Sequence, residues 1–544
     1  MEKAAADVFA RWQRAQTRKE EWRGAYQEAY EYALPQRNLY DQWEGQAVGQ
    51  KRTGKIFDST AVNATQRFAN RLQSGLFPPY KAWCRLEPGN AIPEESRSEV
   101  QVALDAYQTI FFDMLKQSNF DLAMGEFLLD LCVGTACMLI QPGDATTPIR
   151  YTAVPQFLCA FEEGPHGIVQ NVYRRMRRAV SVIEREWPDL KMTSELKRIK
   201  REAPQTEIEL IEATCWHEED GIFGYYLLTD KSKDGAPKTI VYRQLLSSPW
   251  VVARYMKASG EIIGRGPLLN AMPDIKTLNK TVEFLLKNAS LAIGGIYTAA
   301  DDGVLNPQTV QIRPGAILPV ARNGGPSGPS LMPLKTASDV NLSQLVINDL
   351  RMAIKQALLD NSLPPENMSA RSATEIVERM RELATNLGSA FGRLIAECMV
   401  PVVRRSLAVM DQLGLVVLPL KLDGLEVKIV PVSPLAKAQS MDDVQDVVQW
   451  LQFAQSLGPA GLMAVRMDKI MDYMASKMGI PGTLVTTEAE RQQMAQQAQQ
   501  MMQQSPEMAQ AVAGGMAGQP MPAVNGRNPG GPTAVSPQLM EAMR

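Results

Sequence analysis

Two long helical patterns that bracket a short strand-rich segment restrict the fold more than any other feature of this sequence. In the first pattern, apolar residues recur every three or four positions and form one seam: Ile275, Leu278, Val282, Leu285 and Ala289. The second runs over about 337–360, with Leu342, Leu345, Leu350, Ile354 and Leu358 apolar. Between them lie two strand patterns, "GGIYTAA" and "GAILPVA", and the Gly/Pro loop "RNGGPSGPS". The sequence therefore predicts two rods of about 35 Å each, bracketing a small β module.

The first of these helices also carries a row of lysines. Lys276, Lys280 and Lys287 lie within about 40° of one another, because each helical residue advances by roughly 100°. Glu283 falls in the same row. The turn before the helix consists of Gly264, Arg265, Gly266 and Pro267; glycine permits the turn and proline suits the first helical turn. For a lone helix such a row is most often a solvated face, and a bound polymer is the functional alternative.

The first half of the chain reads as helices followed by a sheet. Residues 3–34 form a helical pattern closed by Pro35, and Asp58 or Ser59 can cap the next helix, which ends at "LFPP". Further helices are expected around 97–117 and 121–140. From 148 to 256 the residues are β-branched and aromatic and are interrupted by Gly, Pro and Asp. This segment predicts an antiparallel sheet with one inserted helix, "SVIEREWPDL".

The second half returns to helix. The loop "DNSLPPENMSAR" is followed by a capping box, Ser372 to Glu375, that starts a helix running to about Gly414. Pro401 should bend this helix because it removes a backbone donor. A strand, "LEVKIVPV", and helices over 433–457 and 461–478 follow. The Gln/Met-rich and Gly/Pro-rich stretch 486–544 is expected to be partly disordered.

Composition limits the classes of function. The chain has 544 residues, so several domains are expected, and its net charge of −2 gives no overall basic field for nucleic acid. The six cysteines lack CxxC spacing and are expected to be buried free thiols. No signal peptide and no membrane-spanning run of about 18 apolar residues is expected.

No convincing catalytic constellation is present, so no catalytic, cofactor or metal residue is predicted. The string "GQKRTGKI", Gly49 to Ile56, resembles a nucleotide-binding loop, but Ile56 cannot supply the hydroxyl that holds Mg²⁺. The two histidines lack zinc-protease spacing, and the pairs Asp301–Asp302 and Asp442–Asp443 are more typical of turns and helix starts. The cluster "RRMRR", Arg174 to Arg178, favours a strand end facing solvent or a neighbouring subunit over direct contact with DNA.

Several motifs occur in one order along the chain: "YALP", "FDSTAVNATQRFANRLQSGLFPP", "WCRLEP", "NFDLAMGEFLLDLCVGTACMLI", "GRGPLLNAMPDIKTLNK", "SATEIVERM" and "VSPLAKAQ". Each is a weak or moderate signal, but their collinear order is a strong one. From the first helix to about residue 480 the chain resembles the portal, or head-to-tail connector, proteins of short-tailed bacteriophages. The Gln-rich end departs from that pattern.

The resemblance implies an α+β fold, mainly α, assembled as a ring of about twelve subunits at one capsid vertex. It implies a wing (1–266), stem helices (267–292 and 336–360), a clip (293–335), a tunnel loop (361–373), a long kinked helix (374–425) and a crown (426–485). The tunnel loop would use small, polar or hinge-like residues: Asn361, Ser362, Pro364, Pro365, Asn367, Ser369 and Arg371.

The resemblance also implies partners and a location. Double-stranded DNA would pass through the ring, and terminase, tail, scaffold and capsid proteins would dock on it, in the virion and earlier in the host cytoplasm. Channel-facing candidates are Lys276, Lys280, Lys287, Arg351 and Lys355, with pairing to acids of adjacent subunits as an equal alternative. A packaging NTPase using "GQKRTGK" and a scaffold or minor capsid protein that forms no ring are the competing functions.

Overall fold

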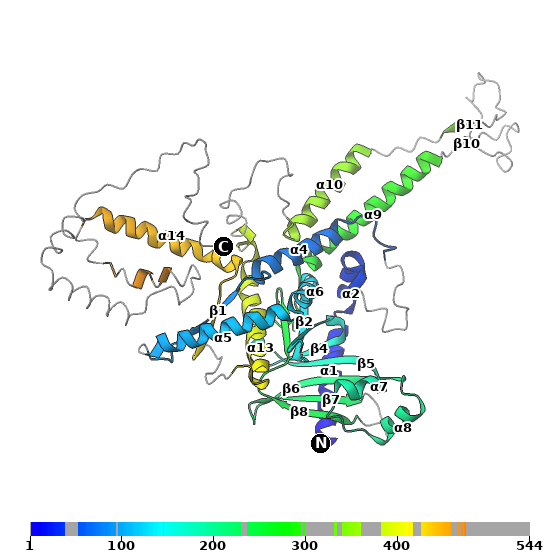
Figure 1. Ribbon diagram of the computed structural model, residues 1–544. Coiled ribbons are helices and arrows are strands. Elements are labelled where there is room, and N and C mark those ends of the chain that lie inside the picture. The colour runs from blue at the N-terminus through cyan, green and yellow to red at the C-terminus, as the bar shows by residue number, and fades with distance from the viewer. Residues whose placement is uncertain are drawn as a thin grey trace, which may run out of the picture. The chain divides into compact units, whose positions relative to one another are not determined.

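The computed structural model describes residues 2–37, 53–93, 96–144, 146–229, 237–294, 297–299, 331–333, 340–360, 382–383, 385–416, 426–458 and three short pieces between 465 and 474. All of them belong to one compact unit that spans Met1–Pro481. Within these residues the chain is a mixture of helix and strand, as the sequence predicts (Figure 1).

The N-terminal segment forms two helices instead of the single predicted one. Helix α1 spans Glu2–Glu20 and α2 spans Arg23–Ala33, followed by the 3₁₀ turn η1, Pro35–Arg37. The two helices have different partners: α1 packs on a sheet, whereas α2 packs against α9 (Pro267–Gly294) and α4 (Thr60–Leu76). A single straight helix could not reach both partners, so the chain changes direction at Glu21 and Trp22.

The apolar segment predicted as a helix over 121–140 is half helix and half strand. Helix α6 ends at Val133 (Phe120–Val133), and β2 covers Thr135–Pro142. Between them Gly134 lies so close to another turn that a Cβ atom there would be 2.2 Å from the Gly264 carbonyl oxygen. Six successive β2 residues are buried, so the segment has no polar side to reveal its period. The prediction was therefore wrong beyond Val133.

Two antiparallel sheets replace the single predicted one. The first has the order β3-β2-β9, with β3 at Ile149–Val154 and β9 at Trp250–Arg254. The second has the order β4-β5-β6-β7-β8, in which each strand pairs with the next along the chain. Its strands are Cys159–Glu163, Val169–Ala179, Glu207–His217, Ile222–Thr229 and Thr239–Leu245. The 3₁₀ turns η3 (Gln156–Leu158) and η4 (Pro165–Gly167) flank β4.

Helices cover both faces of the five-stranded sheet. On one face α1 buries Val8 and Trp12 against the strands. On the other lie α7 (Val180–Glu186) and α8 (Ser194–Glu202), so two helices are inserted where one was predicted. Helix α8 escaped prediction because it is short and strongly charged, with only Leu196 fully buried.

Helices α4, α5 (Arg97–Gln117) and α14 (Pro434–Ser456) and the strand β12 (Val427–Pro431) confirm predicted elements, whereas the antiparallel partner of that strand, β1 (Cys84–Pro88), was not predicted. At the start of α4 the Asp58 carboxylate accepts a bond from the Thr60 amide, whereas the Ser59 side chain makes no capping bond. The six cysteines are free and buried, as expected.

The two helices that bracket a β module are confirmed. They are α9 and α10 (Val340–Ala357), and they pack on each other (Figure 1). The strands β10 (Tyr297–Ala299) and β11 (Leu331–Pro333) pair antiparallel between them. The predicted strand "GAILPVA", the following Gly/Pro loop, the tunnel loop 361–373 and the capping box at Ser372 lie outside the described residues.

The long kinked helix is described from residue 385 and has two irregularities. Gly388 adopts φ 48°, and α12 (Ser389–Leu394) then passes into a π-helical turn, η5 (Ile395–Met399), before α13 (Val400–Gln412). The π turn ends two residues before Pro401, the residue predicted to distort the helix, and such turns are a recognised cause of helix bending.

Candidate functional site

The base of the α9–α10 pair is fixed to the rest of the chain by a polar junction. Asn279 of α9 is buried, and its side-chain oxygen accepts the amides of Phe57 (2.8 Å) and Asp58 (3.1 Å). The Asp58 carboxylate in turn accepts Nε (2.9 Å) and Nη2 (2.7 Å) of Arg351 on α10. Burial alone would raise the pKa of Asp58, but bonds from Thr60 and Arg351 lower it overall. Arg351, a predicted channel residue, is thus engaged within its own chain.

A second junction holds the C-terminal end of α10. The buried carboxylate of Asp360 lies 3.2 Å from Nη1 of Arg67 and 3.5 Å from Nη2 of Arg71, both on α4. Arg71 also donates to the carbonyl of Leu359, which adopts φ 54°. The helix therefore ends at a fixed point on α4, immediately before the segment predicted as the tunnel loop.

The predicted lysine row lies on the surface of α9, and each lysine has an acidic partner in its own chain. Lys276 reaches Glu28 of α2 at 2.9 Å. Lys280 (2.9 Å) and Lys287 (2.6 Å) both bind Glu283, and these two bonds lower the pKa of that carboxyl. The row thus sets three ammonium groups against two carboxylates and retains only a small excess of positive charge.

Lys355, the fifth channel candidate, is half-buried on α10. No ion pair joins it to any residue in the described part of the chain.

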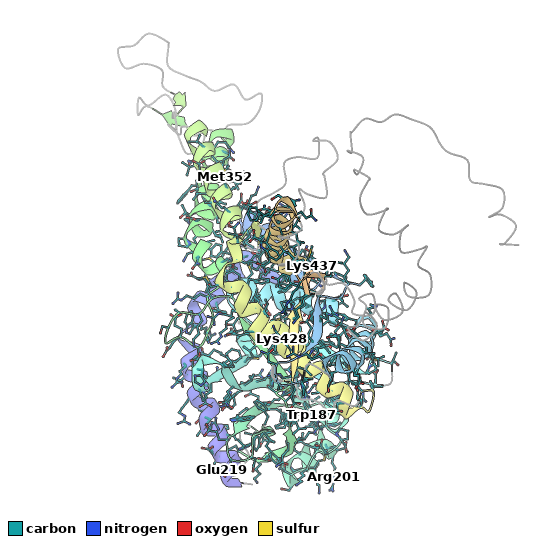
Figure 2. All side chains as sticks on the ribbon, turned by 90° about the vertical axis from the view of Figure 1, so that its left-hand side faces the viewer. Trp187, Arg201, Glu219, Met352, Lys428 and Lys437 are labelled. Carbon is teal, nitrogen blue, oxygen red and sulfur yellow. The ribbon has the colours of Figure 1, made fainter. Side chains whose placement is uncertain are left out.

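Large apolar side chains are exposed on the same two helices. On α9 they are Phe284 (53% exposed) and Leu286 (54%); on α10 they are Leu345 (60%), Val346 (41%) and Met352 (68%), the last of which is labelled in Figure 2. Leu345 was grouped with the apolar residues of the second helix because it is apolar, yet it points away from the contact between α9 and α10. The sequence contains a signal for this exposure. Leu345 and Met352 are seven residues apart and share one side of the helix, whereas Ile354 and Leu358 fall on the opposite side.

The predicted turn before α9 is a close contact between three backbone segments. The Gly264 carbonyl accepts the Tyr26 hydroxyl (2.6 Å), and the Gly264 amide donates to the Thr135 hydroxyl (2.8 Å). A Cβ atom at Gly266 would lie 2.1 Å from the Cys132 carbonyl oxygen, so only glycine fits there, and Pro267 starts α9. These close backbone contacts explain why the turn from Gly264 to Pro267 contains two glycines.

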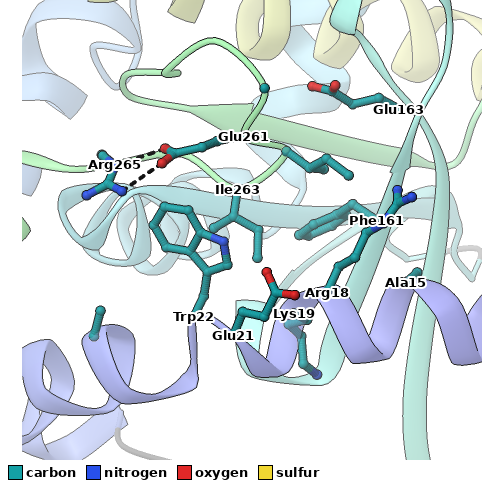
Figure 3. A pocket seen from close by; sticks show the side chains of 13 residues that line it. Ala15, Arg18, Lys19, Glu21, Trp22, Phe161, Glu163, Glu261, Ile263 and Arg265 are labelled. Carbon is teal, nitrogen blue, oxygen red and sulfur yellow. Dashed lines mark hydrogen bonds and ion pairs between the residues drawn. The ribbon is translucent and has the colours of Figure 1, made fainter.

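Arg265 and its neighbours border a pocket of about 790 Å³ (Figure 3). Arg265 binds Glu261 through two nitrogens and lies 4.8 Å from the ring centre of Trp22. Figure 3 shows Trp22 beside Ile263 and Arg265, and Arg18 extending past Phe161. Nearby, burial lowers the pKa of Lys19 to about 8, and its ammonium donates to the Phe157 carbonyl.

A buried arginine joins the three-stranded sheet to the kinked helix. Arg254 of β9 is 1% exposed, and all of its guanidinium nitrogens donate: to Glu397 (Nε 3.1 Å, Nη2 2.7 Å), to Glu163 (2.9 Å) and to the carbonyls of Ile262 and Gly167. Burial alone would lower the pKa of Arg254, but the two carboxylates raise it overall. Glu397 lies in the π turn, so this irregular turn carries the principal partner of the arginine. Sequence reasoning missed this network because its members are far apart along the chain.

The remaining predicted clusters are paired within the chain. Arg175 and Arg177 of β5 bind Glu209 of β6, Arg174 lies 3.4 Å from Glu212, and Arg178 pairs with Glu186. Each arginine of "RRMRR" is therefore paired within the chain, three of them across to β6 and Arg178 to α7, and the exposed Arg177 agrees with the predicted strand end that faces solvent.

Lys55 of the nucleotide-loop-like string binds Glu31 at 2.7 Å. Within the described ranges, no group of three or more His, Cys, Asp or Glu side chains could hold a metal, and no helix could cross a membrane.

The family of the chain follows from its sequence. A family model described as "Bacteriophage head to tail connecting protein" matches residues 5–485. The chain belongs to this family. It is 24% identical over 529 residues to a probable portal protein of Bordetella phage BPP-1, covering 90% of this chain and 92% of that relative. It is 21% identical over 488 residues to the portal protein of Escherichia phage T7, covering 85% of each chain.

Solved structures with local similarity come from gene transfer agent particles. A chain from the neck of an empty particle computed with C6 symmetry has a TM-score of 0.32 at 12% identity, covering 80% of this chain and 96% of that one. A chain from the neck of a native particle computed with C12 symmetry has a TM-score of 0.28 at 12% identity, covering 76% and 93%. These scores are low, and the family assignment depends on the sequence matches.

Proposed function

We propose that copies of this head-to-tail connecting protein close into a ring of about twelve subunits at one capsid vertex. Double-stranded DNA passes through the ring during packaging and ejection, and terminase and tail proteins dock on it. Residues 1–266 act as the wing, α9 and α10 as the stem, 293–335 as the clip, 361–373 as the tunnel loop and 426–485 as the crown. The role is structural, and the named relatives are a probable portal protein and a portal protein.

One observation carries the ring: α9 and α10 expose large apolar side chains on several sides at once. Phe284 and Leu286 differ by about 200° around α9, and Leu345 and Met352 face away from it. A helix pair that is apolar on several sides is typical of a buried position. Covering these four half-exposed side chains would contribute roughly 1 kcal/mol each, which favours contacts with neighbours on both flanks.

Weak contact with the DNA backbone suits a channel through which DNA slides. The whole chain has a net charge of −2, and the lysine row of α9 is largely neutralised by Glu28 and Glu283. Contacts between DNA and the side chains that line the channel would involve phosphates and carry no sequence preference. Such a surface would let DNA move without holding it at one site.

The direct test of this function is the mass and shape of the purified full-length protein. Native mass spectrometry and electron microscopy should show a closed ring with a central opening and a mass that is a multiple of the 60.1 kDa chain. A protein that remains a single subunit at all concentrations would contradict the proposal and favour a scaffold or minor capsid role.

The alternative of a packaging NTPase has a separate test. Lys55 is bound to Glu31 and is followed by Ile56, which lacks the hydroxyl a magnesium-nucleotide site needs. The protein should therefore show no ATP turnover with or without DNA. Turnover that disappears in Lys55→Ala would contradict the structural role.

A further inference from the structure

The face of α9 that points away from α10 combines positive charge with an aromatic ring. Lys276, Lys280, Phe284 and Lys287 lie within about 80° of one another around the helix, on the side opposite its buried seam. The Lys280 ammonium lies 5.0 Å from the ring centre of Phe284, and that ring is half exposed. We call these four residues the lysine–phenylalanine face. An exposed phenylalanine beside neutralised lysines suits a contact with protein better than a surface for sliding phosphates.

The face of α10 that points away from α9 has a complementary composition. Leu345, Asp349, Met352 and Gln356 follow one another at intervals of four, three and four residues, so they form one stripe. Leu345 and Met352 are its most exposed apolar members. Asp349 is also exposed and forms no ion pair with any residue that the structure describes. We call these four residues the leucine–methionine stripe.

The two surfaces match in length and in level. Each spans eleven residue steps, or about 16 Å along its helix. The helices run in opposite directions, and their buried seams cover 275–285 on α9 and 347–358 on α10 (Figure 1). Residues 276–287 of α9 therefore lie at the same level along the helix pair as residues 345–356 of α10. A rotation about a ring axis preserves height, so the lysine–phenylalanine face of one copy meets the leucine–methionine stripe of the next at the same level.

The two surfaces also lie on opposite sides of the helix pair. A surface and its complement on opposite sides of one subunit produce a head-to-tail contact, which closes into a ring when the rotation fits. Lysines of one copy would then lie near Asp349 of the next, and Phe284 near Leu345 and Met352. If the lysine–phenylalanine face lined the channel, the stripe would instead lie on the outside of the ring with its apolar side chains uncovered.

We propose that the lysine–phenylalanine face of α9 packs against the leucine–methionine stripe of a second copy of this chain. This inference rests on the proposed ring and specifies its stem contact. Lys280 and Lys287 then lie between subunits and not in the channel. The helices α9 and α10 alternate around the wall, and their remaining faces line the channel. Thr277, Thr281 and Asn288 form one such face, about 90° from the lysines.

Charge reversal followed by rescue tests the contact. Lys280→Glu with Lys287→Glu places four acids together with Glu283 and the neighbour's Asp349, so rings should be lost and single subunits should dominate in native mass spectra. Adding Asp349→Lys should restore most of the rings. Asn288→Glu, which lies off the proposed contact on the same helix turn, is the matched control and should assemble like the wild type.

Two results would overturn the inference. One is a double variant that still assembles fully and instead loses only DNA retention, which would place the lysines in the channel. The other is a triple variant that assembles no better than the double variant. Wild-type protein that forms no ring would contradict the proposed function itself, so the two failures are distinguishable.

A cross-linking experiment covers the case in which charge reversal prevents folding. Lys280→Cys with Met352→Cys should give a ladder of covalent multimers on mild oxidation with copper phenanthroline, and reductant should remove it. The six native cysteines are buried and should not contribute. Asn288→Cys with Met352→Cys is the control pair and should give no ladder. Absence of a ladder from the first pair in rings, or its appearance only in the control pair, would overturn the inference.

Discussion

The β9–π-turn region and the α9–α10 pair use charge in opposite ways. Around Arg254 every guanidinium nitrogen has a partner in the same chain, and the arginine side chain is buried. On α9 the charged groups are paired too, but they remain exposed, and large apolar residues lie uncovered beside them. The first region is complete within one subunit. The second is complete only when a neighbour covers it, so the two regions should respond differently to mutation.

The largest effect on the single chain is expected from Arg254→Met. Removing the arginine takes the main partner from the half-buried Glu397, which keeps only Arg393, and breaking such a largely buried pair typically costs about 3 kcal/mol. The free energy of unfolding from urea titration should fall by that amount. The control is Arg243→Ala, because Arg243 pairs with Asp189 at the surface and an exposed pair is worth about 0–1 kcal/mol. Equal losses in the two variants would contradict the contrast between sealed and exposed charges.

Lys19 predicts a rise of stability with pH. Its pKa is lowered to about 8 by burial, whereas the unfolded chain keeps its ordinary value of 10.5. Between these values the unfolded state binds more protons, so raising the pH favours the folded state, by about 3 kcal/mol at most. The unfolding free energy of the wild type should therefore increase relative to Lys19→Met from pH 8 to pH 10. A difference in unfolding free energy between the wild type and Lys19→Met that stays constant over that range would show that burial does not lower the pKa of Lys19.

At the base of the α9–α10 pair, Asp58→Asn should cost about 1–3 kcal/mol, because it removes a carboxylate that binds Arg351. The folded pKa of Asp58 lies below its ordinary value of 3.8. Its stabilisation is thus present above about pH 4 and is lost as the pH falls through the folded pKa. Urea titrations of wild type and variant between pH 2 and pH 6 should converge at the acid end. If the difference in unfolding free energy between the wild type and Asp58→Asn widened toward acid pH, the pKa of Asp58 would not be lowered in the folded chain.

The smallest effect is expected at the Lys276–Glu28 pair. Both side chains are about half exposed, and such pairs contribute about 0–1 kcal/mol. Lys276→Ala should leave the unfolding free energy of the single chain nearly unchanged in urea titration at moderate salt. A loss comparable with that of Arg254→Met would mean that α9 is also sealed within one subunit.

The sequence predicts the elements with strong periodicity and fails where burial hides the period. The seam from Ile275 to Leu285 identifies α9, because one side of the helix is apolar and the other is polar. The apolar run that forms β2 is buried throughout, so it was mistaken for helix beyond Val133. The break at Trp22 depends on two distant packing partners, and nothing local signals it.

The sequence predicts which residues of the candidate site share one helix face, but it does not predict which side chains they contact. The spacing of Lys276, Lys280 and Lys287 places them on one face, and the structure confirms that placement. Their pairing with Glu28 and Glu283 depends partly on the fold, since Glu28 lies on another helix. The engagement of Arg351 by Asp58 joins residues 293 positions apart, which no local pattern can indicate.

The central claim is that the chain encloses DNA by association with its own copies. Electron microscopy of the purified wild-type protein tests it most directly. We expect closed rings whose central opening is walled by α9 and α10 of every subunit. Particles without an opening, or rings in which these two helices lie apart and face outward, would contradict it.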